Sequence, residues 1–201
     1  MSHLKQHIYF MTNAELIGLA KNRFIDEEDQ IAIAQLSYRR AHNYLIENTG
    51  LKKGARDLLW NYKGYARKCE LINNGHYFNE PEKYHELYDG YATQIRSRSP
   101  WRIPRVFLAH YRWHSHGATS HTAQTGTPPE IIEDIYHKDV TNRRALDAHG
   151  PSGYYYSGPS NTERMIIENS NTPLDLIIKI SAASPDERNR NLAMKTMAKR
   201  S

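Results

Sequence analysis

The sequence predicts an all-α protein, a short irregular helical repeat with two loop insertions. Three observations point to this class. A motif recurs in which an apolar run ends at Asn or His and a Gly or Asn break follows. Elsewhere, apolar residues return every three to four positions, which is the spacing of one helix face. Thr-Pro pairs and an acidic run stand where helices are expected to begin.

The recurring motif is present in four copies that are only loosely alike. In each copy, a basic or polar residue leads an apolar run. The copies span residues 43–48 before Gly50, 68–73 before Gly75, 144–149 before Gly150 and 164–169 before Asn171. One such unit cannot bury its apolar face alone, whereas stacked copies can, so the pattern predicts a helical solenoid.

The N-terminal half is predicted to hold a cap and two helix pairs. Residues 1–37 form the cap, in which Asn13 is expected to cap a first helix. The acids at 26–29 are expected to begin a second helix, because negative charge is favourable at a helix N-terminus. The helix pairs follow in residues 38–88, and Pro81 occupies an early helical position.

The C-terminal half is predicted to resume the repeat after an insertion at residues 90–126. Within that insertion, residues 106–111 are expected to form a short helix and residues 116–126 a loop. Thr127 is expected to cap the next helix, whose buried stripe would be Ile131, Ile132, Ile135 and Tyr136. A second insertion, a Gly/Tyr loop at 150–160, precedes a helix whose apolar residues are Leu174, Leu176, Ile177 and Ile180.

Composition limits the class of protein. A chain of 201 residues with 39% hydrophobic and 24% charged residues is expected to be an ordered single domain, residues 1–201. The single cysteine excludes a disulfide framework and a cysteine-based metal site. No apolar run approaches the roughly 20 residues of a membrane span, and the N-terminus lacks a signal peptide's apolar core. A soluble, cytoplasmic protein is therefore expected.

Charge is unevenly distributed along the chain. The net charge is +5 and the pI is about 9.2. Residues 90–129, hereafter the acid-free segment, contain no Asp or Glu, and their arginines equal the net excess. A surface that only confers solubility usually mixes both signs. The segregation predicts a polyanionic or acidic partner.

The acid-free segment also carries aromatic residues among its arginines. Arginine side chains can fork onto phosphates while aromatic rings stack on exposed bases, so this mixture suits nucleic acid. The alternative is that the aromatic residues belong to the core and the arginines pair with acids on neighbouring helices. The candidate binding residues are Arg96, Arg98, Trp101, Arg102, Arg105, Tyr111, Arg112 and Trp113, together with the loop tyrosines Tyr154, Tyr155 and Tyr156.

Four histidines in the same segment raise the question of a metal site. His110 and His114 have the helical i, i+4 spacing, and His116 and His121 follow. Zinc sites normally draw three or four ligands, and no carboxylate or thiol lies nearby in the sequence. Exposed or phosphate-facing histidines are therefore the favoured interpretation, and no metal or cofactor is predicted.

The Thr-Pro starts at residues 127 and 172, with the runs 143–146 and 166–173, resemble the variant leucine-rich repeat. That family is an all-α relative of HEAT-type solenoids. The resemblance covers about residues 126–149 and 161–193, is looser over 39–75, and is absent from 90–125. The resemblance implies a helical solenoid fold and indicates almost nothing about activity, because solenoids of this kind have unrelated functions.

Three functions are compatible with these observations. The first is a non-enzymatic protein that binds nucleic acid through the acid-free segment. The second is an adaptor or inhibitor that docks on a larger protein, because arginines suit carboxylates as well as phosphates. The third is a HEAT-like DNA glycosylase, for which Asp57, Trp60, Trp101 and Trp113 are candidates although no motif aligns them.

Overall fold

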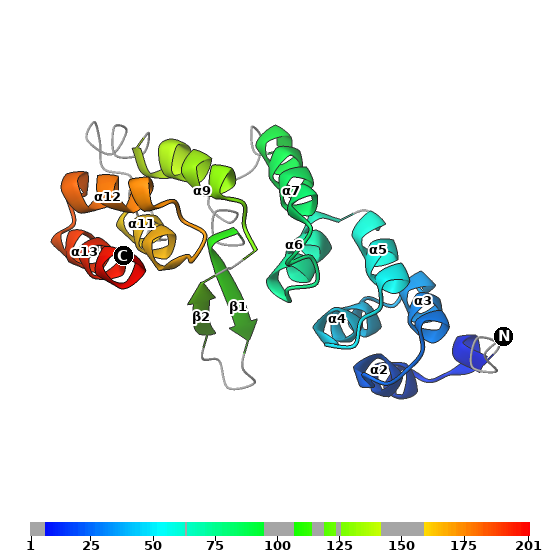
Figure 1. Cartoon of the computed structure of the whole chain (residues 1–201). Helices are drawn as coiled ribbons and strands as arrows, with labels where there is room; N and C mark the ends of the chain where they lie inside the picture. Colours follow the sequence, from blue (N-terminus) through cyan, green and yellow to red (C-terminus); the bar gives the residue numbers. More distant parts are fainter. Residues whose placement is uncertain (1–6, 63, 95–106, 114–118, 124–125, 142–158) are drawn as a thin grey trace, which may run out of the picture. The chain divides into compact units, whose positions relative to one another are not determined.

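The protein is helical in class, as predicted (Figure 1). The computed structural model describes residues 7–62, 64–94, 107–113, 119–123, 126–141 and 159–201. The chain divides into two compact units, unit 1 (residues 1–76) and unit 2 (residues 77–201). The single domain expected from the sequence stays a prediction. Within the described ranges, no helix is both long enough and apolar enough to cross a membrane.

Unit 1 is built from short helices of equal length, 9 residues each, preceded by the single turn η1 (Ile8–Phe10). The helices are α2 (Asn13–Lys21), α3 (Glu27–Gln35), α4 (Arg39–Glu47), α5 (Lys53–Asn61) and α6 (Tyr65–Asn73). The starts of α2, α4 and α6 are 26 residues apart, as are those of α3 and α5. Since α2 packs on α4 and α3 on α5, helices in equivalent positions are neighbours. A helical repeat requires this stacking, although the solenoid itself stays a prediction.

Polar side chains determine where the first two helices begin. Thr12 accepts a hydrogen bond from Glu15 N, and the Glu15 carboxylate accepts one from Thr12 N at 2.7 Å, which makes a capping box. Thr12 therefore caps α2, and the expected cap Asn13 is instead its first residue. Asp26 caps α3 by accepting from Asp29 N at 2.9 Å, so the acidic run does begin a helix.

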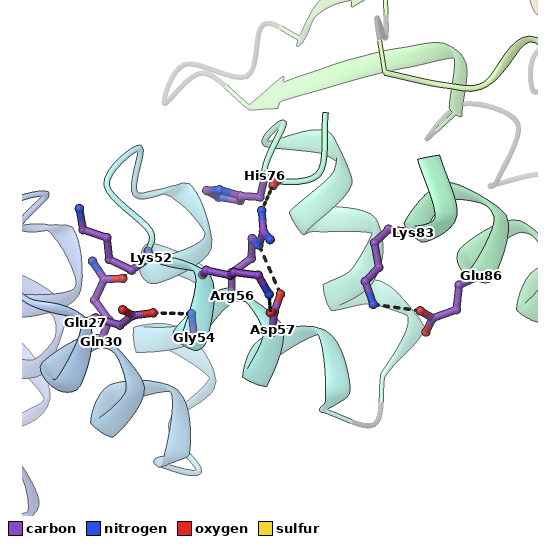
Figure 2. A network of polar contacts seen from close by, with 10 residues as sticks. Glu27, Gln30, Lys52, Gly54, Arg56, Asp57, His76, Lys83 and Glu86 are labelled. Atoms are coloured by element: carbon purple, nitrogen blue, oxygen red, sulfur yellow. Dashed lines mark hydrogen bonds and ion pairs between the residues drawn. The ribbon is translucent and has the colours of Figure 1, made fainter. Parts of the chain in front are cut away.

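One hydrogen bond recurs between copies at the 26-residue period, and its second instance, Arg56 to His76, is drawn in Figure 2. The side chain of Gln30 in α3 is buried, and its Nε2 donates to the Gly50 carbonyl at 2.8 Å. One period later, Arg56 in α5 donates from Nη1 to the His76 carbonyl at 2.5 Å. The second helix of a copy thus binds the loop after the first helix of the next copy: α3 binds the loop after α4, and α5 binds the loop after α6. Equivalent residues make equivalent contacts, which is what nearest-neighbour packing of repeats requires.

Asn48, just after α4, links two copies through its side-chain amide. Its Nδ2 donates to the carbonyls of Ala20 and Asn22 at 2.8 and 3.1 Å, where α2 ends. Its Oδ1 accepts from Gly50 N at 2.8 Å. The last carbonyls of a helix have no partner within that helix, so Asn48 satisfies groups that α2 leaves open. Asn48, which ends one copy of the sequence motif, therefore links that copy to the preceding one.

Unit 2 combines helices with one hairpin. Its elements are α7 (Pro81–Gln94), β1 (Ala109–Trp113), β2 (Thr119–Ala123), α9 (Pro129–Ile135), the π-helical turn η3 (Tyr136–Thr141), α11 (Pro159–Glu168), α12 (Leu174–Ala183) and α13 (Glu187–Arg200). The last helix packs on both α11 and α12, and α11 also packs on η3. The predicted stripe is confirmed, since its four residues are all buried: Ile131, Ile132, Ile135 and Tyr136.

The predicted apolar face of α12 is confirmed except at its first residue. Leu176, Ile177 and Ile180 are buried, but Leu174 is 44% exposed. Leu174 is the first residue of the helix. No helical residue three or four positions before it indicates which face it belongs to. The error therefore concerns one end of the element and leaves its buried face unchanged.

Buried polar groups join the C-terminal helices. The carboxylate of Glu163 in α11 accepts from the Ser184 hydroxyl and from Asn189 Nδ2, at 2.9 Å for Asn189. Arg200, at the end of α13, donates to the Thr172 carbonyl at 2.7 Å. Buried polar groups are stable only when they are hydrogen-bonded, so these contacts fix how the helices meet.

Candidate nucleic-acid interface

The centre of the acid-free segment is an antiparallel hairpin. In it, Ala109–Trp113 pairs with Thr119–Ala123 (Figure 1). The helix expected over residues 106–111 is therefore wrong beyond Leu108, and the loop expected over 116–126 contains a strand. Small or aromatic residues alternate with His and Arg along β1, which is a strand period, and Tyr, Trp and Thr favour strands.

The hairpin begins and ends at buried residues. Phe107 and Leu108, directly before β1, are both buried. After β2, the hydroxyl of the buried Thr127 donates to the Phe107 carbonyl. Thr127 therefore ties the two ends of the hairpin together and does not cap α9, as the sequence had indicated; the residue at that cap is Pro128.

Gly126 lies against a buried tyrosine of α7. A Cβ atom at this position would overlap the hydroxyl of Tyr84 and lie 3.3 Å from Cα of Phe78. Tyr84 is fully buried, and burial raises the pKa of its hydroxyl. The close approach requires a residue without a side chain, so Gly126 holds the end of the acid-free segment against α7.

We expect Gly126→Ala to destabilise unit 2 by about 1–3 kcal/mol, because the added methyl overpacks a site with no free volume. Urea unfolding followed by circular dichroism measures this change. Gly18→Ala is the matched control, because a Cβ there meets nothing within 4 Å and alanine is the better helix former. Equal stability of the two variants would show that the contact with Tyr84 does not constrain the chain.

Helices α7 and α9, which flank the acid-free segment, are bridged by polar contacts. The Tyr88 hydroxyl donates to the Asp134 carboxylate at 2.7 Å, and the Lys138 ammonium donates to the same oxygen at 2.6 Å. A second bridge joins His85 Nε2 to Glu130 Oε1 at 3.0 Å. These contacts join α7 to α9 and η3 within unit 2.

The register of the hairpin replaces the helical grouping of its histidines. In β1 and β2, Tyr111 lies opposite His121, and His110 lies opposite Thr122. Because residue 110 is in a strand, the i, i+4 relation to His114 does not place the two histidines on one helix face. Among the described residues, no group of three or more His, Cys, Asp or Glu is placed to hold a metal ion.

Only part of the predicted site lies in the described structure. Tyr111, Arg112 and Trp113 are consecutive residues of β1, so they alternate between the two faces of the hairpin. The remaining predicted residues lie outside the described ranges: Arg96, Arg98, Trp101, Arg102, Arg105, Tyr154, Tyr155 and Tyr156. The structure thus adds two paired strands with their register and the buried residues at their ends, and the role of the arginines stays a prediction.

Two residues considered for a glycosylase belong to the framework of unit 1. Trp60 is 1% exposed, so its ring is part of the core. The carboxylate of Asp57 pairs with the Lys53 ammonium and lies 3.4 Å from Arg56 Nε (Figure 2). A glycosylase needs an accessible ring on which the base can stack. The ring of Trp60 is buried and the carboxylate of Asp57 is paired, so these two residues do not form such a site.

The shifted pKa values of unit 1 have structural causes. Burial lowers the pKa of His42 and of His76, and His76 Nε2 also binds the Ile46 carbonyl at 2.5 Å. Burial raises the pKa of Glu70, and the nearby guanidinium groups of Arg39 and Arg67 oppose that shift. These groups join α4, α6 and the loop after α6, and they lie in the other unit from the acid-free segment.

Comparison with known proteins adds no relative to this description. No protein-family model, no curated protein and no solved structure matches the chain. The resemblance to the variant leucine-rich repeat therefore stays a prediction, and the function has to be argued from the chain's own residues.

The anchoring residues are the part of the site that the sequence did not reveal. Gly126 and Thr127 were assigned to a loop and a helix cap, and Tyr84 to a helix face. The sequence did contain a signal for the hairpin itself. Small or aromatic residues alternate with polar ones over 109–113, and a second short segment with two Thr, 119–123, follows a stretch that contains Gly. Two short strands with a turn between them are typical of a hairpin.

Proposed function

We propose that this protein is a non-enzymatic nucleic-acid-binding protein that uses the acid-free segment as its contact surface. The observation that carries the proposal is the hairpin: it lies within a stretch that has arginines and no acids, and both its ends are held by buried residues. An anchored two-stranded ribbon is an element that proteins place against nucleic acid. Cationic side chains along such a segment supply the phosphate contacts.

The segregation of charge supports a polyanion in particular. Residues 90–129 contain five arginines and no acid, so their formal charge is of one sign. A long-range field of one sign attracts a phosphate backbone and speeds the encounter with it. The proposal includes a cytoplasmic location, which accords with a chain that contains a single cysteine.

The proposal is tested by the salt dependence of binding. If the segment contacts phosphates, the logarithm of the binding constant should fall linearly with the logarithm of the salt concentration. We expect joint replacement of Arg98, Arg102 and Arg105 by Ala to reduce that slope by about 2–3 and to weaken binding across unrelated sequences. Fluorescence anisotropy with mixed-sequence oligonucleotides at several salt concentrations measures both effects.

The matched control removes three positive charges elsewhere. Arg188, Lys195 and Lys199 are exposed residues of α13, and replacing them with Ala should leave the slope nearly unchanged. Equal losses for the two triple variants would show that net charge alone drives binding and would contradict the proposal. If the wild-type chain binds no nucleic acid at low salt, and the arginines of the segment instead capture an acidic protein, the adaptor hypothesis replaces it.

A further inference from the structure

The two faces of the hairpin carry different chemistry. Successive residues of a strand belong to opposite faces, and in an antiparallel pair directly opposed residues share a face. The pairs Tyr111–His121 and Trp113–Thr119 therefore lie on one face, hereafter the ring face. The opposite face contains the pairs His110–Thr122 and Arg112–Ser120.

We infer that the ring face is a stacking platform for single-stranded nucleic acid, an inference that rests on the proposed function. Tyr111, Trp113 and His121 occupy neighbouring register positions on one face of the ribbon, and all three are residue types with an aromatic ring. Every base has a flat face that can stack on such rings, but in a duplex those faces are covered by the neighbouring base pairs. A ring face thus selects strands whose bases are free.

The opposite face and the flanks of the hairpin complete this interface. Arg112 stands on the opposite face, between His110 and the hydroxyl residues of β2, in a stretch without any acid. Arginine on this face can contact phosphates while the rings hold bases, a combination found in single-strand-binding grooves. The assignment adds His121 to the binding residues and divides β1 into base-contacting and phosphate-contacting positions.

The alternative occupant is a duplex, with the ribbon inserted in its major groove. A groove-reading ribbon presents donors and acceptors to base edges, which only the polar face of this hairpin could supply. The ring face would then have no role. Because the two modes use opposite faces of the same strands, substitutions on one face at a time distinguish them.

The test compares the full chain with three double variants on a single strand of about 16 nucleotides and on the matching duplex. We expect Tyr111→Ala with Trp113→Ala to weaken single-strand binding by about 10- to 100-fold, with the salt dependence unchanged. The control is His110→Ala with Thr122→Ala, a pair on the opposite face that leaves Arg112 in place, which should leave single-strand affinity nearly intact. Tyr111→Phe with Trp113→Phe should retain most of the affinity, because stacking needs a ring.

The outcomes separate this inference from the proposed function. Wild-type protein that binds neither probe contradicts both. If it binds nucleic acid but the ring-face variant loses single strand and duplex equally, or loses neither, the stacking platform is wrong and the proposed function stands. The melting temperature of each variant checks folding.

A second readout uses the intrinsic fluorescence of tryptophan. In a Trp101→Phe chain, two tryptophans remain: Trp60, which is buried, and Trp113. Single strand should then quench the emission of Trp113 and duplex should not, because only an unstacked base can lie on the indole. Unchanged emission at saturating single strand would contradict the platform, even if the alanine variants failed to fold.

Discussion

Replacing Ile177 with Asp should unfold unit 2. Ile177 lies in α12 and is completely buried, so the new carboxylate would lose its hydration without gaining a partner. A buried, unpaired charge is among the few single changes that cost more than about 4 kcal/mol, which is a large part of the stability of an ordinary domain. Thermal melting followed by circular dichroism should show a transition at much lower temperature, or aggregation on expression.

The adjacent residue provides a close control. Ile178 is 44% exposed, so Ile178→Asp keeps its charge in water and should change stability by less than about 1 kcal/mol. Ile132→Asp, in the buried stripe of α9, should behave like Ile177→Asp. If the variants at 177 and 178 melted alike, the buried face of α12 would be assigned wrongly.

Replacing Asn48 with Ala should have the next largest effect and should act on unit 1. Alanine removes two donated hydrogen bonds and one accepted bond, and it leaves the end of α2 without its cap. The loss of bonds to buried backbone groups gives an expected destabilisation of about 2–4 kcal/mol. Urea unfolding of the full chain, followed at the helical signal, measures the change.

Asn74 is the matched control for Asn48, because it occupies the equivalent position one 26-residue period later. Its side chain is exposed and donates at 2.9 Å to the Glu70 carbonyl of its own helix. Asn74→Ala should therefore cost about 1 kcal/mol or less. Similar losses at the two positions would indicate that Asn48 acts as an ordinary helix cap and not as a link between copies.

The repeat illustrates what pattern alone could predict. The apolar runs at 43–48 and 68–73 mark two copies, and both end at an Asn. Residues 1–37 are predicted as an N-terminal cap, and the sequence motif does not mark a copy that ends at Asn22. Its membership in the repeat follows from the equal 26-residue spacing of α2, α4 and α6, which becomes visible only once the helix boundaries are known.

The hairpin shows where such prediction failed. A short apolar run such as 106–111 is compatible with either a helix or a strand, and length alone does not separate the two. The strand is decided by its partner, Thr119–Ala123, which lies beyond a turn. Pairing of this kind depends on residues outside any local window, so the sequence predicted a helix where the chain forms a strand, and the role of the candidate residues stays a prediction.

For this protein, the sequence alone determined the helical class, the buried faces of α9 and α12 and the location of the charge-segregated segment. The helical class and the buried faces depend on residues three or four positions apart, which are neighbours in any helix, and the charge-segregated segment depends on composition alone. Only the tertiary structure decided that Tyr111 lies opposite His121, that Gly126 packs on Tyr84, and that Gln30 and Arg56 make the same contact one period apart. Each of these joins residues that are far apart in the chain, and packing, not local preference, selects such partners.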